Sequence, residues 1–159
     1  MTNWPIDGRI STGFEDTRPK GDGLIETGMT NERSWTVEPE HLASAFGSGL
    51  VEALSTPTLV GFCEECARTM VDPKLPIGRK TVGMSIRIDH LAATPPGMRV
   101  TVTAELVEID GRRLRFEIEA YDEMDRIGRA THERFVIDAD RFDDRLRRKA
   151  KRTSDAPAR

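Results

Sequence analysis

The chain has 159 residues, of which 37% are apolar and 32% are charged; this suits one domain with a modest core and some burial against a partner chain. The formal net charge is -3 and the two signs are interspersed, so neither a nucleic-acid partner nor a membrane partner is expected. The first residues lack the charged-then-apolar pattern of a secretory signal, which predicts a cytoplasmic location.

Residues 1–22 combine Gly, Pro, Thr and charged residues without periodicity, which predicts a poorly ordered arm ahead of a domain at residues 23–140. The first strand of that domain is predicted at residues 34–37, where the sequence reads SWTV. The glycine-bearing segment at residues 46–49 is predicted to be a mobile connection that could cover a pocket.

One long helix is predicted from residue 56 to about residue 71. Thr56 is expected to be its N-cap, with Pro57 at the first helical position, and Pro73 and Pro76 are expected to stop it. Apolar side chains recur at helical spacing, namely Leu59, Cys63, Cys66 and Met70. Both thiols are therefore interpreted as core groups, and since no second cysteine pair exists, no metal and no cofactor are expected.

A strand is predicted at residues 80–90. Its apolar row faces the helix and consists of Val82, Met84, Ile86 and Ile88, with His90 at the end. Gly83 lies near the middle of this strand. A glycine there either marks a bulge or leaves room for a ligand to reach a backbone N–H, as in an oxyanion hole.

A hairpin is predicted next, because apolar and polar residues alternate on both sides of Gly111. The apolar positions are Val100, Val102, Ala104 and Leu106 before the turn and Leu114, Phe116, Ile118 and Ala120 after it. All have even numbers, so one shared face requires an odd loop length or a bulge. Gly111 can supply the positive φ that such a turn needs.

The last strand is predicted to place Gly128, Ala130, His132 and Arg134 on one face. The small residues leave space, so Arg134 is a candidate for binding a carboxylate or phosphate. The alternative is a structural ion pair with a cross-strand carboxylate such as Glu117 or Glu119. Residues 141–159 form a basic, polar tail, which is interpreted as a frayed, solvated helix rather than a nucleic-acid arm.

One helix followed by antiparallel strands predicts an α+β fold in which the sheet wraps the helix. Thr56 and Glu64 lie about 12 Å apart along that helix, at roughly 1.5 Å per residue, so a substrate or a second chain could sit between them. Glu64 is a candidate general base toward water, and His90 is a candidate general acid or base. The alternatives are a plain N-cap for Thr56, a solvated helix position for Glu64 and a structural role for His90.

These residues resemble the fluoroacetyl-CoA thioesterase family within the hot-dog-fold thioesterases. The resemblance covers roughly residues 23–138. It rests on Thr56, Gly61 and Glu64 in TPTLVGFCEE, on His90 followed by AATPPG within a few residues, on VTVTAEL before GRRL, and on IGRATHER. The resemblance implies a hot-dog fold, an antiparallel sheet wrapped around one long central helix.

The resemblance also implies that Thr56, Glu64 and His90 form the catalytic set, and that Gly83 and Arg134 bind substrate. It implies a homodimer or higher homo-oligomer with active sites at the subunit interface, and hydrolysis of acyl-CoA. The segment AFGSGLVEALS is less aromatic than its counterpart in the fluoroacetyl-specific member, so another small or medium acyl-CoA is the expected substrate.

Two chemical routes remain open at this point. Thr56 could attack the thioester to form an acyl-enzyme, or Glu64 and His90 could activate a water molecule directly. A non-catalytic acyl-CoA binding or sensing protein on the same fold is the alternative function.

Overall fold

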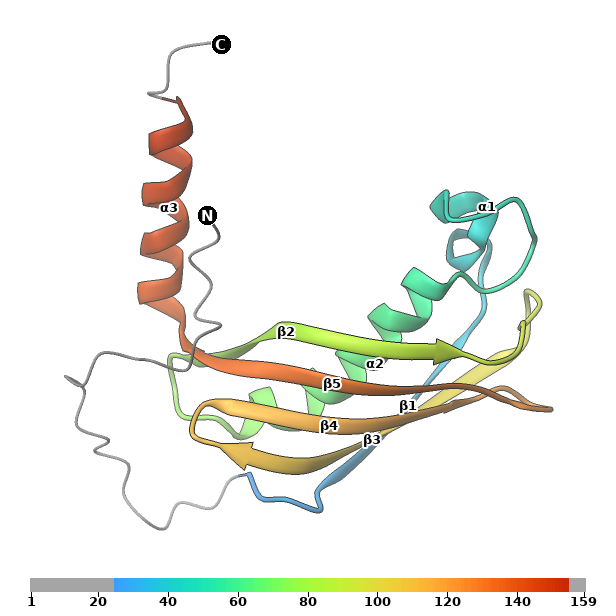
Figure 1. Ribbon diagram of the computed structural model, residues 1–159, viewed down its shortest axis with the longest axis horizontal. Helices are drawn as coiled ribbons and strands as arrows, with labels where there is room; N and C mark the ends of the chain where they lie inside the picture. Colours follow the sequence, from blue (N-terminus) through green and yellow to red (C-terminus); the bar gives the residue numbers. More distant parts are fainter. Residues whose placement is uncertain (1–24, 155–159) are drawn as a thin grey trace.

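A computed structural model describes residues 25–154, and its body is a five-stranded antiparallel sheet curved around a long helix (Figure 1). The elements are β1 (Thr30–Thr36), η1 (Pro39–His41), α1 (Ala43–Phe46), α2 (Thr56–Val71), η2 (Asp72–Lys74), β2 (Arg79–His90), β3 (Arg99–Asp110), β4 (Arg113–Tyr121), β5 (Arg126–Asp138) and α3 (Ala139–Ser154). The strand order is β1-β3-β4-β5-β2. The predicted arm at residues 1–22 lies outside the described residues.

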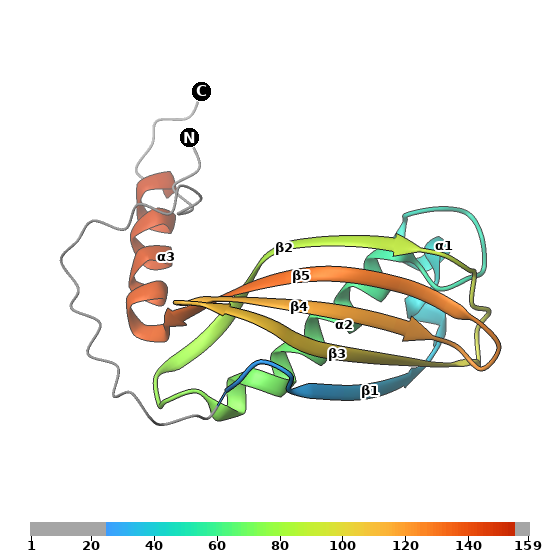
Figure 2. The ribbon, with the colours of Figure 1, turned by 60° about the horizontal axis from the view of Figure 1, so that its bottom comes forward.

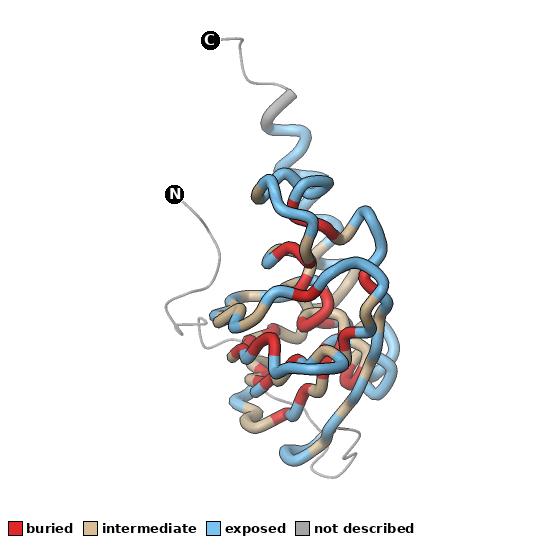
Figure 3. Tube along the Cα trace, turned by 90° about the vertical axis from the view of Figure 1, so that its right-hand side faces the viewer, coloured by how far each residue is buried: buried red, intermediate tan, exposed pale blue. Residues whose placement is uncertain are grey.

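Helix α2 packs along one face of the sheet, which bends around it (Figure 2). The four apolar positions predicted on its inner stripe are all buried, namely Leu59, Cys63, Cys66 and Met70. Burial raises the pKa of the Cys63 thiol to about 12 and that of Cys66 to about 11, so both stay protonated. Their interpretation as core groups is confirmed, and buried positions in Figure 3 concentrate between helix and sheet.

The predicted hairpin is formed by β3 and β4. Asp110 pairs with Arg113 across a two-residue turn, in which Gly111 has a φ of 59°. The required change of register comes from a bulge between Leu106 and Glu108. All eight even-numbered apolar residues are buried on the helix side, so the prediction of a bulge that keeps them on one face is confirmed.

Strand β2 departs from the predicted alternation. A bulge between Gly83 and Ser85 shifts its register against β5, so that Thr81 and Gly83 face the helix before the bulge and Ile86 faces it afterwards. The prediction that Val82 belongs to the helix-facing row is therefore wrong. One extra residue inverts the inside and outside positions of a strand, because side chains alternate with a period of two.

The two ends of the domain are longer than predicted. Strand β1 begins at Thr30 rather than near residue 34. Beyond Asp138, whose carboxylate accepts a hydrogen bond from the Arg141 backbone N–H, the chain forms helix α3. Figure 1 shows α3 standing clear of the sheet. Within residues 25–154, no helix is long and apolar enough to cross a membrane.

Replacing Phe116 with Ala is expected to lower the free energy of unfolding by about 3–5 kcal/mol, because this fully buried ring fills space between β4 and α2. Arg115→Ala is the matched control on the outer face of the same strand, where its ion pairs are exposed and worth at most about 1 kcal/mol. Urea denaturation of both variants measures the difference. Equal losses would contradict the inward assignment of the even-numbered row.

Candidate active site

Thr56 is the first residue of α2, and the preceding residue caps the helix. The Ser55 hydroxyl accepts a hydrogen bond from the Thr58 backbone N–H at 3.1 Å, with Pro57 in the first turn. The prediction that Thr56 is the N-cap is therefore wrong. Since Ser55 satisfies the helix end, the Thr56 hydroxyl is available for another partner.

That partner is His90 at the end of β2. The Thr56 hydroxyl lies 2.9 Å from Nδ1 of the His90 ring. The other ring nitrogen, Nε2, is buried and has no hydrogen-bond partner within the described part of the chain. Buried polar atoms are rarely left unpaired, so a water molecule, a ligand or another chain is expected to pair with this nitrogen.

Burial lowers the pKa of His90 below its ordinary value of 6.5, an effect that the nearby polar backbone of Ala92 partly offsets. The ring is therefore neutral near pH 7 and carries a free lone pair on one nitrogen. A neutral imidazole in contact with a hydroxyl can take the hydroxyl proton. The Thr56 hydroxyl and the neutral His90 ring therefore have the geometry and the protonation that such a proton transfer requires.

A shallow hollow of about 400 Å³ opens beside this pair. The predicted glycine-bearing connection, residues 46–49, contributes Ser48 and Gly49 to its wall, as the sequence indicated for a segment that covers a pocket. Large apolar side chains are exposed around it, namely Phe46, Leu50, Val51 and Leu91. An apolar rim next to a reactive pair suits an acyl group or a second protein surface.

Glu64 lies in a second group, two helical turns further along α2. Its side chain is 43% exposed, so Glu64 is half-buried rather than fully solvated. The carboxylate lies against Gly83, where any Cβ would overlap it. The predicted bulge at this glycine on β2 is confirmed, and the space that a side chain would fill there is taken by the Glu64 carboxylate. Access of a ligand to the backbone N–H stays a prediction.

Arg134 lies beneath Glu64 and is only 5% exposed. Its Nη1 is 4.0 Å from a Glu64 carboxylate oxygen, and its Nε donates to the Thr81 hydroxyl at 2.8 Å. The Thr81 hydroxyl in turn donates to Asp72 at 2.5 Å. The alternative of an ion pair with Glu117 or Glu119 is wrong, because those side chains lie on the opposite face of the sheet.

His132 completes this second group. Its Nδ1 donates to the Ser85 carbonyl at 2.7 Å, and its Nε2 accepts from Nη1 of Arg134 at 3.2 Å. This pattern requires a neutral ring. Burial and the neighbouring Arg134 lower the pKa of His132, against the Ser85 hydrogen bond and the Glu64 charge. The Glu64 carboxylate lies 3.8 Å from Nε2 of His132. Because this ring is neutral, the positive charge beside Glu64 in this group is that of Arg134.

The sequence indicated part of this second group. The alternation in β5 placed His132 and Arg134 on one face, although it did not assign His132 a role. Asp72 and Thr81 carried no signal, because they join the end of α2 to the start of β2 through a tertiary contact. In one chain, the Thr56 and His90 pair and the Glu64 group remain separate, as the predicted 12 Å spacing along the helix requires.

Comparison with known proteins identifies relatives. Residues 37–140 match the family described as fluoroacetyl-CoA-specific thioesterase. The fluoroacetyl-CoA thioesterase of Streptantibioticus cattleyicolor is 46% identical over 99 residues, which are 62% of this chain and 70% of that protein. A solved structure of a fluoroacetyl-CoA thioesterase aligns with a TM-score of 0.75 and 34% identity over 79% of this chain and 97% of the other.

Two further structures define the fold. A thioesterase superfamily member from Thermus thermophilus aligns with a TM-score of 0.78 and 28% identity, over 83% of this chain and 98% of the other. A hot-dog-like protein from Thermanaerovibrio acidaminovorans aligns with a TM-score of 0.75 and 23% identity, over 82% and 97%. The expected α+β hot-dog fold is confirmed.

The lowered pKa values of His90 and His132 predict that the protein loses stability as the pH falls from 7.5 to 5.5. The unfolded chain binds protons near the ordinary value of 6.5, whereas the folded chain resists protonation, so acid favours unfolding. Urea denaturation across this range measures the slope. A His90→Gln variant should show a shallower slope, and an unchanged slope in that variant would contradict the burial argument for His90.

Proposed function

This chain belongs to the fluoroacetyl-CoA-specific thioesterase family, and on that premise we propose that it hydrolyses a small or medium acyl-CoA thioester to a free acid and CoA. The observation that carries the proposal is the Thr56 hydroxyl, 2.9 Å from the neutral His90 ring, beside an apolar-rimmed hollow. Such a pair suits attack on an acyl carbonyl whose leaving group is a thiol.

The proposed first step uses Thr56 as the nucleophile. His90 accepts the hydroxyl proton while the Thr56 oxygen bonds to the thioester carbonyl carbon. The carbon–sulfur bond then breaks, and the proton passes to the departing CoA thiolate. In the second step Glu64 acts as general base toward water, which attacks the acyl-enzyme ester and releases the acid with Thr56 restored. The favoured route is the acyl-enzyme one because His90 contacts the hydroxyl and no carboxylate of the described chain.

Gly83 and Arg134 are assigned to the Glu64 half of the proposed site. Because Gly83 has no Cβ, the Glu64 carboxylate can lie against the β2 backbone, where the proposed reaction brings the acyl carbonyl. Arg134 is too deeply buried to be the main contact of a substrate. We assign it a positioning role, in which its charge, fixed by Thr81, holds Glu64 in place.

The proposed site is completed by a second copy of the chain. Among residues 25–154, strand β2 is an edge strand with β5 as its one neighbour in the sheet, so none of these residues pairs with its other edge. Two β2 strands paired about a two-fold axis would run antiparallel. His90 at the end of one β2 would then approach the start of the other, near its Gly83 and Glu64. The two separate groups of one chain would become two composite sites in a homodimer.

A cytoplasmic location is proposed as well. Cys63 and Cys66 are free thiols three residues apart on α2, and both serve as buried core groups. Reduced cysteines with a packing role fit a reducing compartment better than an oxidising one.

Thiol release from a panel of acyl-CoA esters tests the proposed reaction. His90→Ala and Glu64→Gln should each lower kcat by about 10²–10⁴, the usual contribution of a general base. Glu65→Gln is the matched control, because this neighbouring carboxylate pairs with Arg33 on another side of α2 and should leave turnover unchanged.

Each result of this panel has a distinct meaning. Full turnover by Glu64→Gln would exclude the carboxylate from the reaction. Binding of acyl-CoA without release of thiol across the whole panel, in the unmodified protein, would replace the proposed enzyme with an acyl-CoA binding or sensing protein. The ester that is hydrolysed fastest identifies the acyl class.

A further inference from the structure

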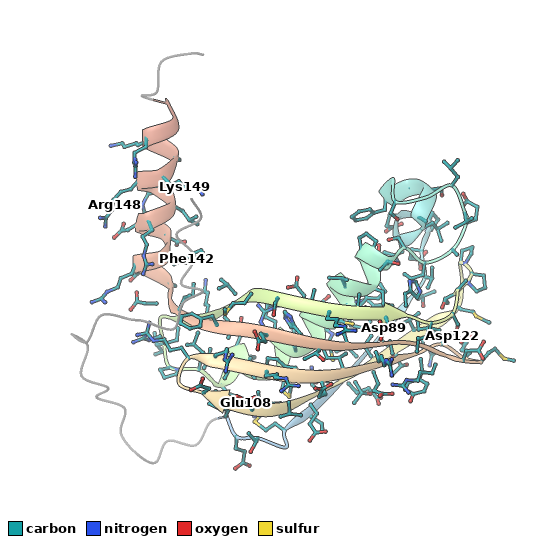
Figure 4. All side chains as sticks on the ribbon, in the orientation of Figure 1. Asp89, Glu108, Asp122, Phe142, Arg148 and Lys149 are labelled. Atoms are coloured by element: carbon teal, nitrogen blue, oxygen red, sulfur yellow. The ribbon has the colours of Figure 1, made fainter. Side chains whose placement is uncertain are left out.

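Helix α3 carries none of the residues assigned to the proposed reaction. Figure 4 shows it standing clear of the sheet, with Phe142, Arg148 and Lys149 labelled along its length. Its residues are mostly exposed. The helix carries seven basic and three acidic side chains, a net charge of +4, in a chain whose total is -3. The remainder of the chain therefore carries -7, so positive charge is concentrated on α3.

Several basic residues of α3 recur at regular spacing along the helix. Four arginines follow one another at steps of four, three and four residues, namely Arg141, Arg145, Arg148 and Arg152. At 3.6 residues per turn these positions form a single stripe along the helix. The three carboxylates lie in the first half of the helix, and residues 145–154 contain six cations and no acid. A stripe of guanidinium groups matches the geometry of phosphate oxygens.

The root of α3 lies at the end of the sheet where β2 begins. The Ala139 backbone N–H donates to the Gly78 carbonyl at 2.9 Å, immediately before β2 begins. Gly83, which contacts Glu64, lies only a few residues further along that strand. From this root the 16-residue helix extends by about 24 Å, at roughly 1.5 Å per residue. In Figures 1 and 2 it rises on the β2 side of the sheet.

We propose that the arginine stripe of α3 binds the phosphate groups of CoA while the thioester lies at the composite site. This rests on the proposed function, because acyl-CoA is the ligand that the site would take. The pantetheine arm separates the thioester from the diphosphate and the ribose phosphate, so their binding groups must stand away from Thr56, Glu64 and His90. Helix α3 concentrates a net charge of +4 on an element that stands clear of the sheet, whereas the remainder of the chain carries a net charge of -7.

Two other anionic partners fit the helix less well. Its large apolar side chains are Phe142 and Leu146, a small area for insertion into a lipid surface. A nucleic acid or an anionic membrane would also meet the negative body of the chain, which would repel it. A small polyphosphate ligand held at its acyl end by the active site avoids both difficulties.

The test compares Arg145→Gln/Arg148→Gln with the control Arg147→Gln/Lys151→Gln. Both double variants lose the same charge, and Gln retains helix propensity, but only the first pair lies on the stripe.

Each protein is assayed with an acyl-CoA and with the same acyl-pantetheine, which lacks the phosphates. The stripe variant should raise KM for acyl-CoA about tenfold at unchanged kcat, as expected for lost charge-assisted hydrogen bonds. Its KM for acyl-pantetheine should not change, and the control should retain both values.

Calorimetric binding of free CoA separates this proposal from the proposed function. If the unmodified protein hydrolyses no thioester, the proposed function is contradicted. A higher Kd for CoA in the stripe variant, but not in the control, would still support the phosphate site. An equal Kd in all three proteins, or equal KM changes for both esters, would overturn it. Reduced binding of the stripe variant to phosphatidylserine vesicles, with CoA binding unchanged, would overturn it in favour of a lipid surface.

Discussion

The burial of α2 against the curved sheet determines where the candidate site residues lie. Because Leu59, Cys63 and Cys66 must face the core, the rotation of the helix is fixed. That rotation sends Thr56 toward the end of β2 and Glu64 toward its middle. It also keeps the two side chains two helical turns apart, so they belong to two separate groups in one chain, which the proposed homodimer treats as two half-sites.

The two half-sites differ in what stabilises them. Thr56 and His90 depend on each other and on a helix cap, Ser55, that leaves the hydroxyl free. Glu64 instead rests on a buried polar chain that runs from Asp72 through Thr81 to Arg134. A buried cation is costly unless its donors are satisfied, and here a hydroxyl and a carbonyl of Thr81 and the ring of His132 satisfy it. The network therefore offers a fixed positive charge to a half-exposed carboxylate.

The sequence predicted the hairpin well, because β3 and β4 alternate strictly and each has one face in the core. It misplaced Val82, since a single bulged residue near Gly83 inverts the strand and alternation alone does not locate it. It misplaced the helix cap by one residue, because Ser55 and Thr56 are both good capping residues. Asp72 and Thr81 could not be predicted, because their contact depends on how the helix end meets the next strand.

In the proposed homodimer, each active site takes Thr56 and His90 from one chain and Glu64 from the other. Mixing the His90→Ala and Glu64→Gln proteins under conditions that allow subunit exchange tests it directly. Random exchange makes half of the dimers mixed, each with one intact composite site, so roughly a quarter of unmodified activity should return. If no activity returns although mixed dimers form, all three residues act within one chain, and the account of the composite site is wrong.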